Sequence, residues 1–405
     1  DELDSPRGRI YLMKDMLETG RPATEEVVRH VDRCLSCLAC MTTCPSGVHY
    51  MHLVDHARVH IQNTYTRPGI DRLLRAFIAR VLPNNRLLRR ALGAARLGKP
   101  FAGLLAAMGL RPLAAMLRLA PARLPPAGAG QGRRRFLPAG SRRGRVALLT
   151  GCVSPVIAPS INAAAIRVLT RHGIEVVVAD AGCCGSMVHH MGREREALSA
   201  ARRQIDALIA EIEGDGLDAI LVTASGCVTT VKDYGYVLRT DGAYAEKALR
   251  VSRLARDISE YLHGLDVAAT RTPSGLVVAY HSACSLQHAQ KIVGAPKELL
   301  CKMGFVVKDV PEGHLCCGSA GTYNILQPEL ARRLRERKVG NIEKLKPDVI
   351  AAGNIGCMTQ IAAGTVIPVV HTVELIDWAT GGPEPEALAG KRGSSAAVAS
   401  VAPAK

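Results

Sequence analysis

Two stretches of this 405-residue chain repeat one order of short apolar runs, each followed closely by cysteine. The runs span residues 145–150, 174–179 and 219–223, and then 276–280, 305–310 and 349–352. The cysteines that follow them are Cys152, Cys183, Cys184 and Cys227 in the first copy, and Cys284, Cys316, Cys317 and Cys357 in the second. Successive groups are 31 and 43 residues apart in the first copy and 32 and 40 in the second. A match of this length predicts two similar structural units.

Helical patterns separate the apolar runs, as at 155–172 and 194–213. This alternation predicts an open, mostly parallel sheet in each copy, within a chain that is α+β overall. Ligands usually bind beyond the carboxyl ends of parallel strands, so each copy would bring its four thiolates to one patch. Gly185 and Gly318 directly follow the vicinal pairs, where they let backbone N–H groups approach sulfur and stabilise its charge.

The repeated cysteines admit three chemical interpretations. Cysteine is common at buried strand ends as a small hydrophobe, but that does not account for a vicinal pair that recurs beside two further cysteines. A thiol–disulfide centre would use the vicinal pairs and leave the other four without a role, namely Cys152, Cys227, Cys284 and Cys357. A metal cluster uses all eight, and we favour that interpretation.

A second cysteine pattern lies near the start of the chain and comprises Cys34, Cys37, Cys40 and Cys44, followed by Pro45. This C-x2-C-x2-C-x3-C-P spacing is that of bacterial ferredoxins, in which the fourth cysteine ligates the second of two [4Fe–4S] clusters. We find no complementary run in the sequence and expect it to lie upstream of Asp1, so that the complete module holds two clusters. A zinc site is the alternative, although zinc knuckles pair two distant C-x2-C halves.

The net charge of +16 is concentrated between Thr66 and Arg145, where 18 Lys and Arg residues accompany one acidic residue, Asp71. The arginines recur beside leucines, which predicts amphipathic helices suited to an anionic membrane surface. A helical linker packed on a partner subunit is the alternative. The longest apolar run, Phe101–Leu110, is about half of the ~20 residues that a transmembrane helix needs. Few aromatic residues accompany the basic ones, so nucleic-acid binding is not expected.

Twelve of the thirteen cysteines belong to these groups, and Cys301 alone is unassigned. Grouped cysteines in a chain that opens without a signal peptide favour metal ligation in a reducing compartment over disulfides. The expected location is the cytoplasm, with peripheral association at the inner face of the cell membrane.

The repeated C…CCG…C pattern resembles the cysteine-rich CCG domain of heterodisulfide reductases and of subunits that accompany flavoenzymes. Preceded by the ferredoxin run, it is similar to the iron–sulfur subunits of membrane-associated hydroxy-acid and glycerol-3-phosphate dehydrogenases. The segments Asp1–Ile10 and Tyr280–Gln290 look most like the glycolate oxidase (glycolate dehydrogenase) iron–sulfur subunit family. The resemblance covers residues 1–60 and 145–380.

This resemblance implies an electron-transfer subunit of an oxidoreductase complex, with no catalytic residue of its own. A separate flavin subunit that holds FAD would oxidise glycolate, and this chain would pass the electrons to a quinone or another acceptor. The sequence agrees, since no G-x-G-x-x-G follows a strand to indicate a dinucleotide site. Subunits of lactate or glycerol-3-phosphate dehydrogenases or of heterodisulfide reductase are the alternatives, and a zinc-holding nucleic-acid-binding protein is a more distant one.

One departure from the resembled family concerns the ligands. Relatives with a non-cubane cluster offer a C-x2-C after the CCG, whereas Thr230 and Gln360 occupy the fifth-ligand positions here. Four thiolates per copy could hold an ordinary cube, a modified cluster or none. Four histidines lie near the repeated cysteines in sequence, namely His189, His190, His281 and His288. We expect them to donate hydrogen bonds to ligands or to lie at the surface, and not to bind metal.

The expected organisation has five parts. A ferredoxin-type module, whose N-terminal half is expected upstream, spans 1–60, a basic amphipathic helical segment spans 61–144, and two CCG lobes span 145–270 and 271–380. Residues 381–405 are rich in Ala, Ser, Gly and Pro and are expected to be disordered.

Overall fold

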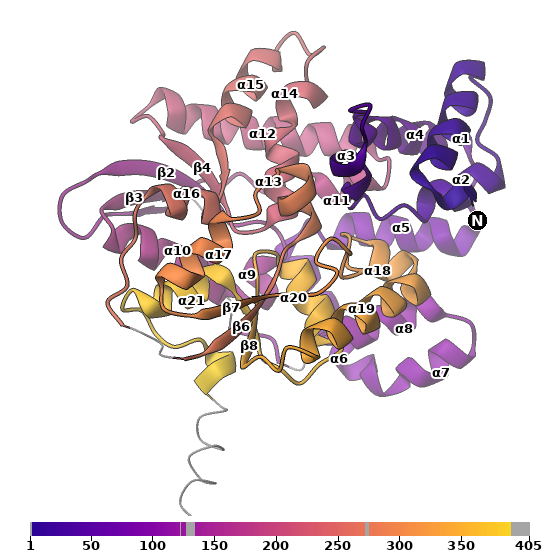
Figure 1. Cartoon of the computed structure of the whole chain (residues 1–405). Coiled ribbons are helices and arrows are strands. Elements are labelled where there is room, and N and C mark those ends of the chain that lie inside the picture. The colour runs from indigo at the N-terminus through magenta and orange to yellow at the C-terminus, as the bar shows by residue number, and fades with distance from the viewer. Residues whose placement is uncertain (1, 122, 127–133, 272–274, 390–405) are drawn as a thin grey trace, which may run out of the picture.

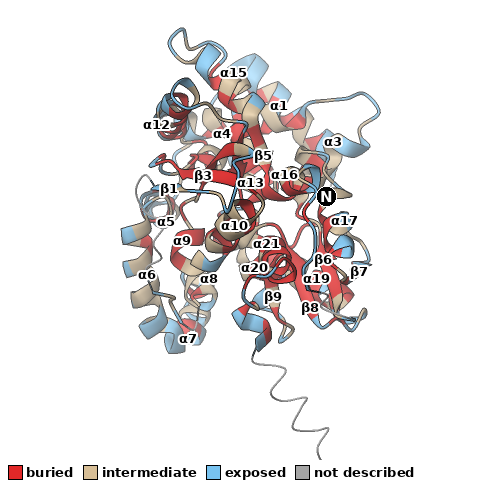
Figure 2. Cartoon of the chain, turned by 90° about the vertical axis from the view of Figure 1, so that its left-hand side faces the viewer, coloured by how far each residue is buried: buried red, intermediate tan, exposed pale blue. Residues whose placement is uncertain are grey.

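The computed structural model of the chain describes residues 2–121, 123–126, 134–271 and 275–389. Helices of the N-terminal part lie on one side of the molecule, and two α/β lobes make up the rest (Figure 1). Each lobe is built on its own sheet. Burial is concentrated in the strands and the helices between the lobes, while α6 and α7 lie exposed at the periphery (Figure 2).

The first sheet has the strand order β1-β3-β2-β4-β5 and is parallel except for β1, which pairs antiparallel with β3. Its strands are β1 (Arg134–Phe136), β2 (Gly144–Leu149), β3 (Ile174–Val178), β4 (Ala219–Val222) and β5 (Ala255–Asp257). The second sheet is parallel throughout, in the order β7-β6-β8-β9. Its strands are β6 (Val277–His281), β7 (Val306–Asp309), β8 (Val349–Ala352) and β9 (Val369–His371). The predicted parallel sheets are thus confirmed.

The two sheets share one register around their central strands. Val146 of β2 lies opposite Val176 and Ala219, and Val278 of β6 lies opposite Val307 and Val349. Val146 and Val278 are therefore equivalent positions of the repeat. Strands β2, β3, β4 and β8 are buried almost throughout, which explains why they appear in the sequence as continuous apolar runs without alternation.

Helices follow the strands in the same order in both lobes. The helices of the first lobe are α9 (Ser154–Ile157), α10 (Pro159–Arg171), α11 (Ser186–His190), α12 (Glu194–Glu213), α13 (Ser225–Lys232), α14 (Tyr234–Val237), α15 (Ala245–Leu254) and α16 (Ile258–Gly264). Those of the second lobe are η3 (the π-helical turn Ser285–Ala289), α17 (Ala295–Lys302), α18 (Tyr323–Leu326), α19 (Pro328–Glu343), α20 (Ile355–Ala362) and α21 (Thr372–Ala379).

The lobes pack against each other through equivalent helices. Helix α10 of the first lobe contacts α21 of the second, and α17 of the second contacts α16 of the first, as expected for a pseudo-twofold arrangement. One hydrophobic cluster runs through this contact and joins the sheets of both lobes. Asp377, buried on α21, accepts hydrogen bonds from Arg167 Nε at 2.8 Å and from Arg171 Nη2 at 3.1 Å. The lobes therefore share one continuous core.

The N-terminal part is helical and has a core of its own, which includes Met16, Val31, Val54 and Ile61. It comprises η1 (Glu2–Asp4), α1 (Pro6–Thr19), α2 (Glu25–Asp32), α3 (Ala39–Thr43) and α4 (Tyr50–Thr64). The basic segment follows as α5 (Gly69–Val81), α6 (Asn85–Gly98), η2 (Lys99–Phe101), α7 (Ala102–Ala107) and α8 (Arg111–Leu119). Among the described residues, no helix combines the length and apolar character needed to span a membrane.

Two details differ from the predicted organisation. The segment 61–144 is not helical throughout, because residues 134–136 form β1, where Arg135 pairs with buried Glu175 of β3 and extends the first sheet. The tail was expected to be disordered from residue 381, but residues 381–389 are placed and Leu388, only 6% exposed, packs into the core shared by the lobes. The predicted disorder of 390–405 lies outside the described residues.

Candidate metal-cluster sites

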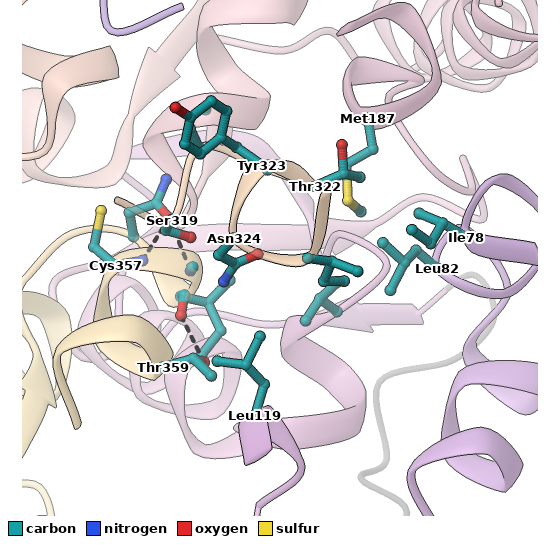
Figure 3. Close-up of a pocket in the computed structure, with 18 of the residues that line it drawn as sticks. Ile78, Leu82, Leu119, Met187, Ser319, Thr322, Tyr323, Asn324, Cys357 and Thr359 are labelled. Atoms are coloured by element: carbon teal, nitrogen blue, oxygen red, sulfur yellow. Dashed lines mark hydrogen bonds between the residues drawn. The ribbon is translucent and has the colours of Figure 1, made fainter. Parts of the chain in front are cut away.

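The eight repeated cysteines line a single cavity of about 700 Å³ between the lobes. Each lies in a loop or first helical turn just beyond a strand, as predicted: Cys152 follows β2, Cys184 follows β3 and Cys227 lies in the first turn of α13, after β4. Figure 3 shows Cys357 of the second lobe on one side of this cavity, and Ile78 of α5 with Leu82 just after that helix on the other. The sequence predicted two separate patches, and the structure brings them to one space.

In the first lobe the cysteine sulfurs are close and largely buried. The Sγ atoms of Cys152 and Cys183 are 3.6 Å apart, and Gly185 N donates to Cys183 Sγ at 3.5 Å. The hydrogen bond between the two sulfurs lowers the pKa of Cys183 to about 3, and the same bond together with burial raises the pKa of Cys152. Hydrogen bonding to Cys183 and burial also raise the pKa of Cys184. Neighbouring thiols thus share protons that a bound metal would displace.

The second lobe repeats this arrangement. The Sγ atoms of Cys284 and Cys316 are 4.0 Å apart, and Gly318 N donates to Cys316 Sγ at 3.4 Å. The hydrogen bond from Cys284 lowers the pKa of Cys316, and the hydrogen bond from Cys317 lowers the pKa of Cys357 to about 6. The glycine N–H contacts expected from the two CCG triplets are therefore present in both lobes.

Loops of the two lobes interlock beside the cysteines. Ser225, which lies two residues before Cys227, accepts a hydrogen bond from Asn354 Nδ2 at 2.9 Å and shares one with Ser285 Oγ at 2.7 Å. Asn354 also caps α20, which carries Cys357. The cysteine loops of one lobe are consequently held in place by the other.

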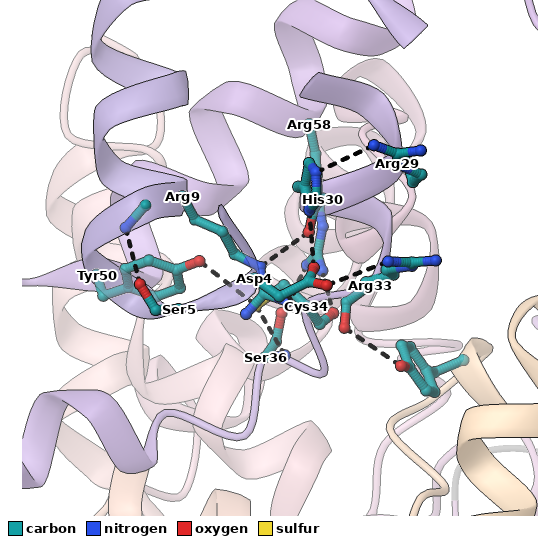
Figure 4. A network of polar contacts seen from close by, with 12 residues as sticks. Asp4, Ser5, Arg9, Arg29, His30, Arg33, Cys34, Ser36, Tyr50 and Arg58 are labelled. Atoms are coloured by element: carbon teal, nitrogen blue, oxygen red, sulfur yellow. Dashed lines mark hydrogen bonds and ion pairs between the residues drawn. The ribbon is translucent and has the colours of Figure 1, made fainter. Parts of the chain in front are cut away.

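The N-terminal cysteine run forms a tight turn that leads into α3. Ser36 and Leu38 both adopt left-handed conformations, with φ of 50° and 61°. Arg58 of α4 holds this turn, since its Nη1 donates to Ser36 Oγ at 2.6 Å and its Nη2 to Cys34 O at 2.9 Å. Tyr50 donates to Cys34 Sγ at 3.5 Å, and the network is drawn in Figure 4.

The four cysteines of this run differ in environment. Cys34 is buried, and the other three are half-buried. Burial raises the pKa of Cys37 to about 12, whereas the backbone N–H groups of Val48 and Ser46 lower the pKa of Cys44. Cys44 thus lies in a more polar environment than Cys37.

The run borders the cysteines of the second lobe. Cys37 packs against the hydrophobic cluster that contains Cys316 and Cys317. Thr42 Oγ1 lies 3.0 Å from His288 Nδ1, and Cys34 lines the same cavity as the repeated cysteines. Three cysteine groups that are far apart in the sequence therefore meet around one space.

The donor set fits iron–sulfur clusters. All thirteen cysteines are free thiols, and the repeated ones are buried or half-buried beside glycine N–H groups. Arg58 and Arg75 line the cavity and supply positive charge for an anionic group. Cys301 is exposed and stands apart from these groups.

One group that the sequence reasoning set aside lies among the cysteines. A ring nitrogen of His281 and the sulfurs of Cys317 and Cys357 all lie within 4.8 Å of one another. The signal was present in the sequence as a histidine at the end of a buried strand. Two of the other histidines have partners elsewhere: His189 Nε2 lies 3.2 Å from Asp55, and His288 contacts Thr42.

Comparison with known proteins agrees with this architecture. Residues 146–232 and 278–362 each match the family model of the CCG cysteine-rich domain, so the chain is a cysteine-rich protein with two such domains. It is 41% identical over 380 residues to the glycolate oxidase iron–sulfur subunit of Escherichia coli, a match that covers 94% of this chain and 89% of the relative. A probable glycolate oxidase iron–sulfur subunit of Bacillus subtilis is 30% identical, with 90% of this chain and 84% of the relative covered. The chain belongs to the family of glycolate oxidase iron–sulfur subunits.

More distant relatives share the fold or part of it. Lactate utilization protein A of Bacillus licheniformis is 24% identical over 244 residues, which cover 58% of this chain and 99% of the relative. A crystal structure of a hypothetical protein from Helicobacter pylori aligns with a TM-score of 0.54 at 11% identity, covering 94% of this chain and 68% of that one. The latter similarity concerns the fold alone.

Proposed function

We propose that this chain is the electron-transfer subunit of a flavin-dependent glycolate dehydrogenase, and that it passes electrons from a flavin subunit to a quinone or similar acceptor. Bound iron–sulfur clusters would supply reversible one-electron chemistry. The observation that carries the proposal is that Cys34 and both repeated cysteine sets line one cavity, while Cys37 packs beside the cysteines of the second lobe. Oxidation of the hydroxy acid itself belongs to the partner subunit, which would hold FAD.

Each cysteine group has a proposed role. Cys34, Cys37, Cys40 and Cys44 would bind [4Fe–4S] clusters in the manner of a ferredoxin. The repeated cysteines would hold a further cluster in one or both lobes. Arg58 and Tyr50 fix the N-terminal turn, and the glycines after the CCG pairs stabilise sulfur charge through their N–H groups.

The apolar side of the cavity supports a lipid-soluble acceptor. Beyond the cysteines the cavity is walled by side chains of α5, α6 and α8, including Ile78, Leu82, Leu92 and Leu119. Figure 3 shows Ile78, Leu82 and Leu119 around the space that Cys357 faces. A cavity of this size and character suits an aromatic ring with an apolar tail, as in a quinone.

The same helices support attachment to a membrane surface. Eight large apolar side chains on α5–α8 are exposed, and they are Ile70, Leu73, Phe77, Leu97, Phe101, Leu104, Met108 and Leu113. Together with the surrounding arginines they form a surface that is both apolar and cationic. Basic residues near an anionic membrane contribute about 1 kcal/mol each, and inserted apolar side chains add to this.

Metal analysis and EPR of the chain, purified anaerobically with its flavin subunit, test the electron-transfer role. We expect iron and sulfide, with less of both in Cys184→Ser and Cys317→Ser. The control Cys301→Ser alters an exposed cysteine and should retain the wild-type content. Zinc without iron or sulfide would reject the proposal. If neither Cys184→Ser nor Cys317→Ser lost iron, the clusters would be restricted to the N-terminal run.

Vesicle binding tests the membrane surface. We expect the complex to co-sediment with vesicles that contain phosphatidylglycerol, and Leu97→Glu with Leu104→Glu to weaken this binding. Val366→Glu is the control, because Val366 is 92% exposed but belongs to the second lobe. Release by high salt would indicate an electrostatic attachment, and release only by detergent would indicate apolar insertion. A complex that stays soluble at low salt would reject the membrane attachment.

A further inference from the structure

His281 is a buried histidine without a partner. It is the last residue of β6, and its side chain is almost fully enclosed, with 1% of the residue exposed. Within the described parts of the chain neither ring nitrogen makes a hydrogen bond of good geometry, and the ring lies against the Cys357 thiol, whose pKa it helps to lower. Burying a polar group without a partner is unfavourable, so such a group in a folded protein calls for an explanation.

The surroundings of His281 are those of a metal ligand. One of its ring nitrogens lies within 4.8 Å of the sulfurs of both Cys317 and Cys357, and those sulfurs lie within the same distance of each other. Three donor atoms at such separations can bind one ion, or neighbouring ions of one cluster, with little movement. Imidazole nitrogen is a normal ligand of iron in iron–sulfur centres that combine histidine with cysteine.

The first lobe lacks this group. Val146 and Val278 are equivalent in the two sheets, so three residues further on His281 is equivalent to Leu149. Leu149 is buried in the apolar core of the first lobe. The two lobes thus present the same four cysteines, but only the second adds a nitrogen donor at the end of its central strand.

The fifth-ligand positions of the resembled family are engaged elsewhere. Gln360 Nε2 donates to Ala331 O at 3.1 Å, and its Oε1 accepts from Asn324 Nδ2 at 3.2 Å. Thr230 Oγ1 donates to Gly226 O at 3.3 Å within α13. Neither side chain is free to replace a fifth cysteine, whereas both nitrogens of His281 are.

We propose that His281 is the fifth ligand of the second-lobe site, where it binds iron in the cluster held by Cys284, Cys316, Cys317 and Cys357. The inference rests on the proposed function and extends it to the coordination of one site. Since imidazole is neutral and a thiolate is anionic, the centre carries less negative charge with His281 than it would with cysteine as its fifth ligand, and its reduction potential is higher than with that fifth cysteine. The first lobe would hold its centre with cysteine alone, so the two centres would differ in their ligands.

Nitrogen hyperfine coupling tests this ligand. The complex is prepared with 15N-labelled histidine, and the second-lobe signal is identified as the pulsed EPR signal that disappears in Cys317→Ser. We expect 15N coupling on that signal in the wild type and its loss in His281→Leu, which reproduces the first lobe. His288→Gln is the control, because His288 flanks the same cysteine loop but contacts Thr42. It should keep the coupling.

His281→Cys keeps the test decisive where His281→Leu fails to assemble a cluster. We expect this variant to retain the iron content of the wild type, to lose the nitrogen coupling and to titrate at a lower potential. Coupling that persists in His281→Leu, or a second-lobe signal without histidine coupling in the wild type, would overturn the proposal. Identical spectra of the wild type and Cys317→Ser would also overturn the proposal, because the second lobe would then hold no cluster. Signals from the N-terminal run would in that case still support the electron-transfer role. Absence of iron from the whole chain would reject the proposed function itself.

Discussion

Replacing Arg58 by methionine should destabilise the turn that carries the N-terminal cysteines. The guanidinium makes two hydrogen bonds to this turn, to Ser36 Oγ and to Cys34 O, from a position that is only 9% exposed. The turn that these bonds hold contains two residues with left-handed backbone conformations, Ser36 with φ of 50° and Leu38 with φ of 61°. The left-handed conformation costs roughly 1–2 kcal/mol per non-glycine residue, and the contacts of Arg58 offset part of that cost.

The expected size of the effect follows from those two bonds. A hydrogen bond with a charged partner stabilises by about 1.5–3 kcal/mol, and methionine keeps most of the side-chain volume while removing both bonds. Taking the lower value for each, we expect Arg58→Met to lose about 3 kcal/mol. That free energy corresponds to a change of about a hundredfold in an equilibrium constant.

Hydrogen–deuterium exchange measures this loss locally. Amides of α4 that open with the N-terminal helical part should exchange about a hundredfold faster in Arg58→Met, since 1.4 kcal/mol is tenfold. Arg72→Met is the matched control, because Arg72 lies exposed on α5. Its effect should stay within about 0.5 kcal/mol. Equal exchange in the two variants would refute the role assigned to Arg58.

Two further predictions concern the lobes. His371 is buried and neutral, donating from Nε2 to Thr223 O at 2.8 Å, and burial lowers its pKa from 6.5 to about 4. As the pH falls, His371 is therefore protonated in the unfolded chain before it is protonated in the folded chain. The free energy of unfolding that is present above pH 6.5 is lost as the pH falls toward 4, by about 2 kcal/mol at pH 5. His371→Asn can still cap α21, and its unfolding temperature should fall less between pH 7.5 and pH 5 than that of the wild type. An equal fall in both proteins would contradict this prediction. Gly318→Ala should lower the unfolding midpoint more than Gly321→Ala. Both glycines have positive φ, but only at Gly318 would Cβ meet a backbone oxygen, Ala331 O, at 2.5 Å. Equal midpoints would show that Ala331 moves aside.

The central strands and long helices were predictable from the sequence. Strands β2, β3, β4 and β8 are buried runs rich in aliphatic residues, and α12 begins at Glu194 and ends at Glu213, as the pattern predicted. The edge strands β1, β5 and β9 were not predicted, because each has three residues and too short a pattern. Such strands are determined by pairing with a neighbour that is distant in the chain.

The cysteine groups were also predictable, but their meeting was not. Local spacing indicates which cysteines share a lobe, whereas the common cavity depends on how α10 packs on α21 and α17 on α16. Those contacts use apolar surface that any partner could cover, so the sequence alone does not specify them. Leu388 illustrates the same point, since an Ala- and Pro-rich composition concealed a residue that packs into the shared core.

The strongest asymmetry of the repeat lies at one position of one strand. Both copies end their central strand beside four cysteines, and a single residue decides whether a nitrogen joins them, Leu149 in one lobe and His281 in the other. A histidine in a sequence near cysteines carries little weight, because most such side chains find another hydrogen-bond partner. Burial without any partner, within 4.8 Å of two sulfurs, removes that explanation for His281. Because Cys37 of the N-terminal run also packs against this lobe, the nitrogen donor belongs to the lobe that borders the N-terminal cysteines.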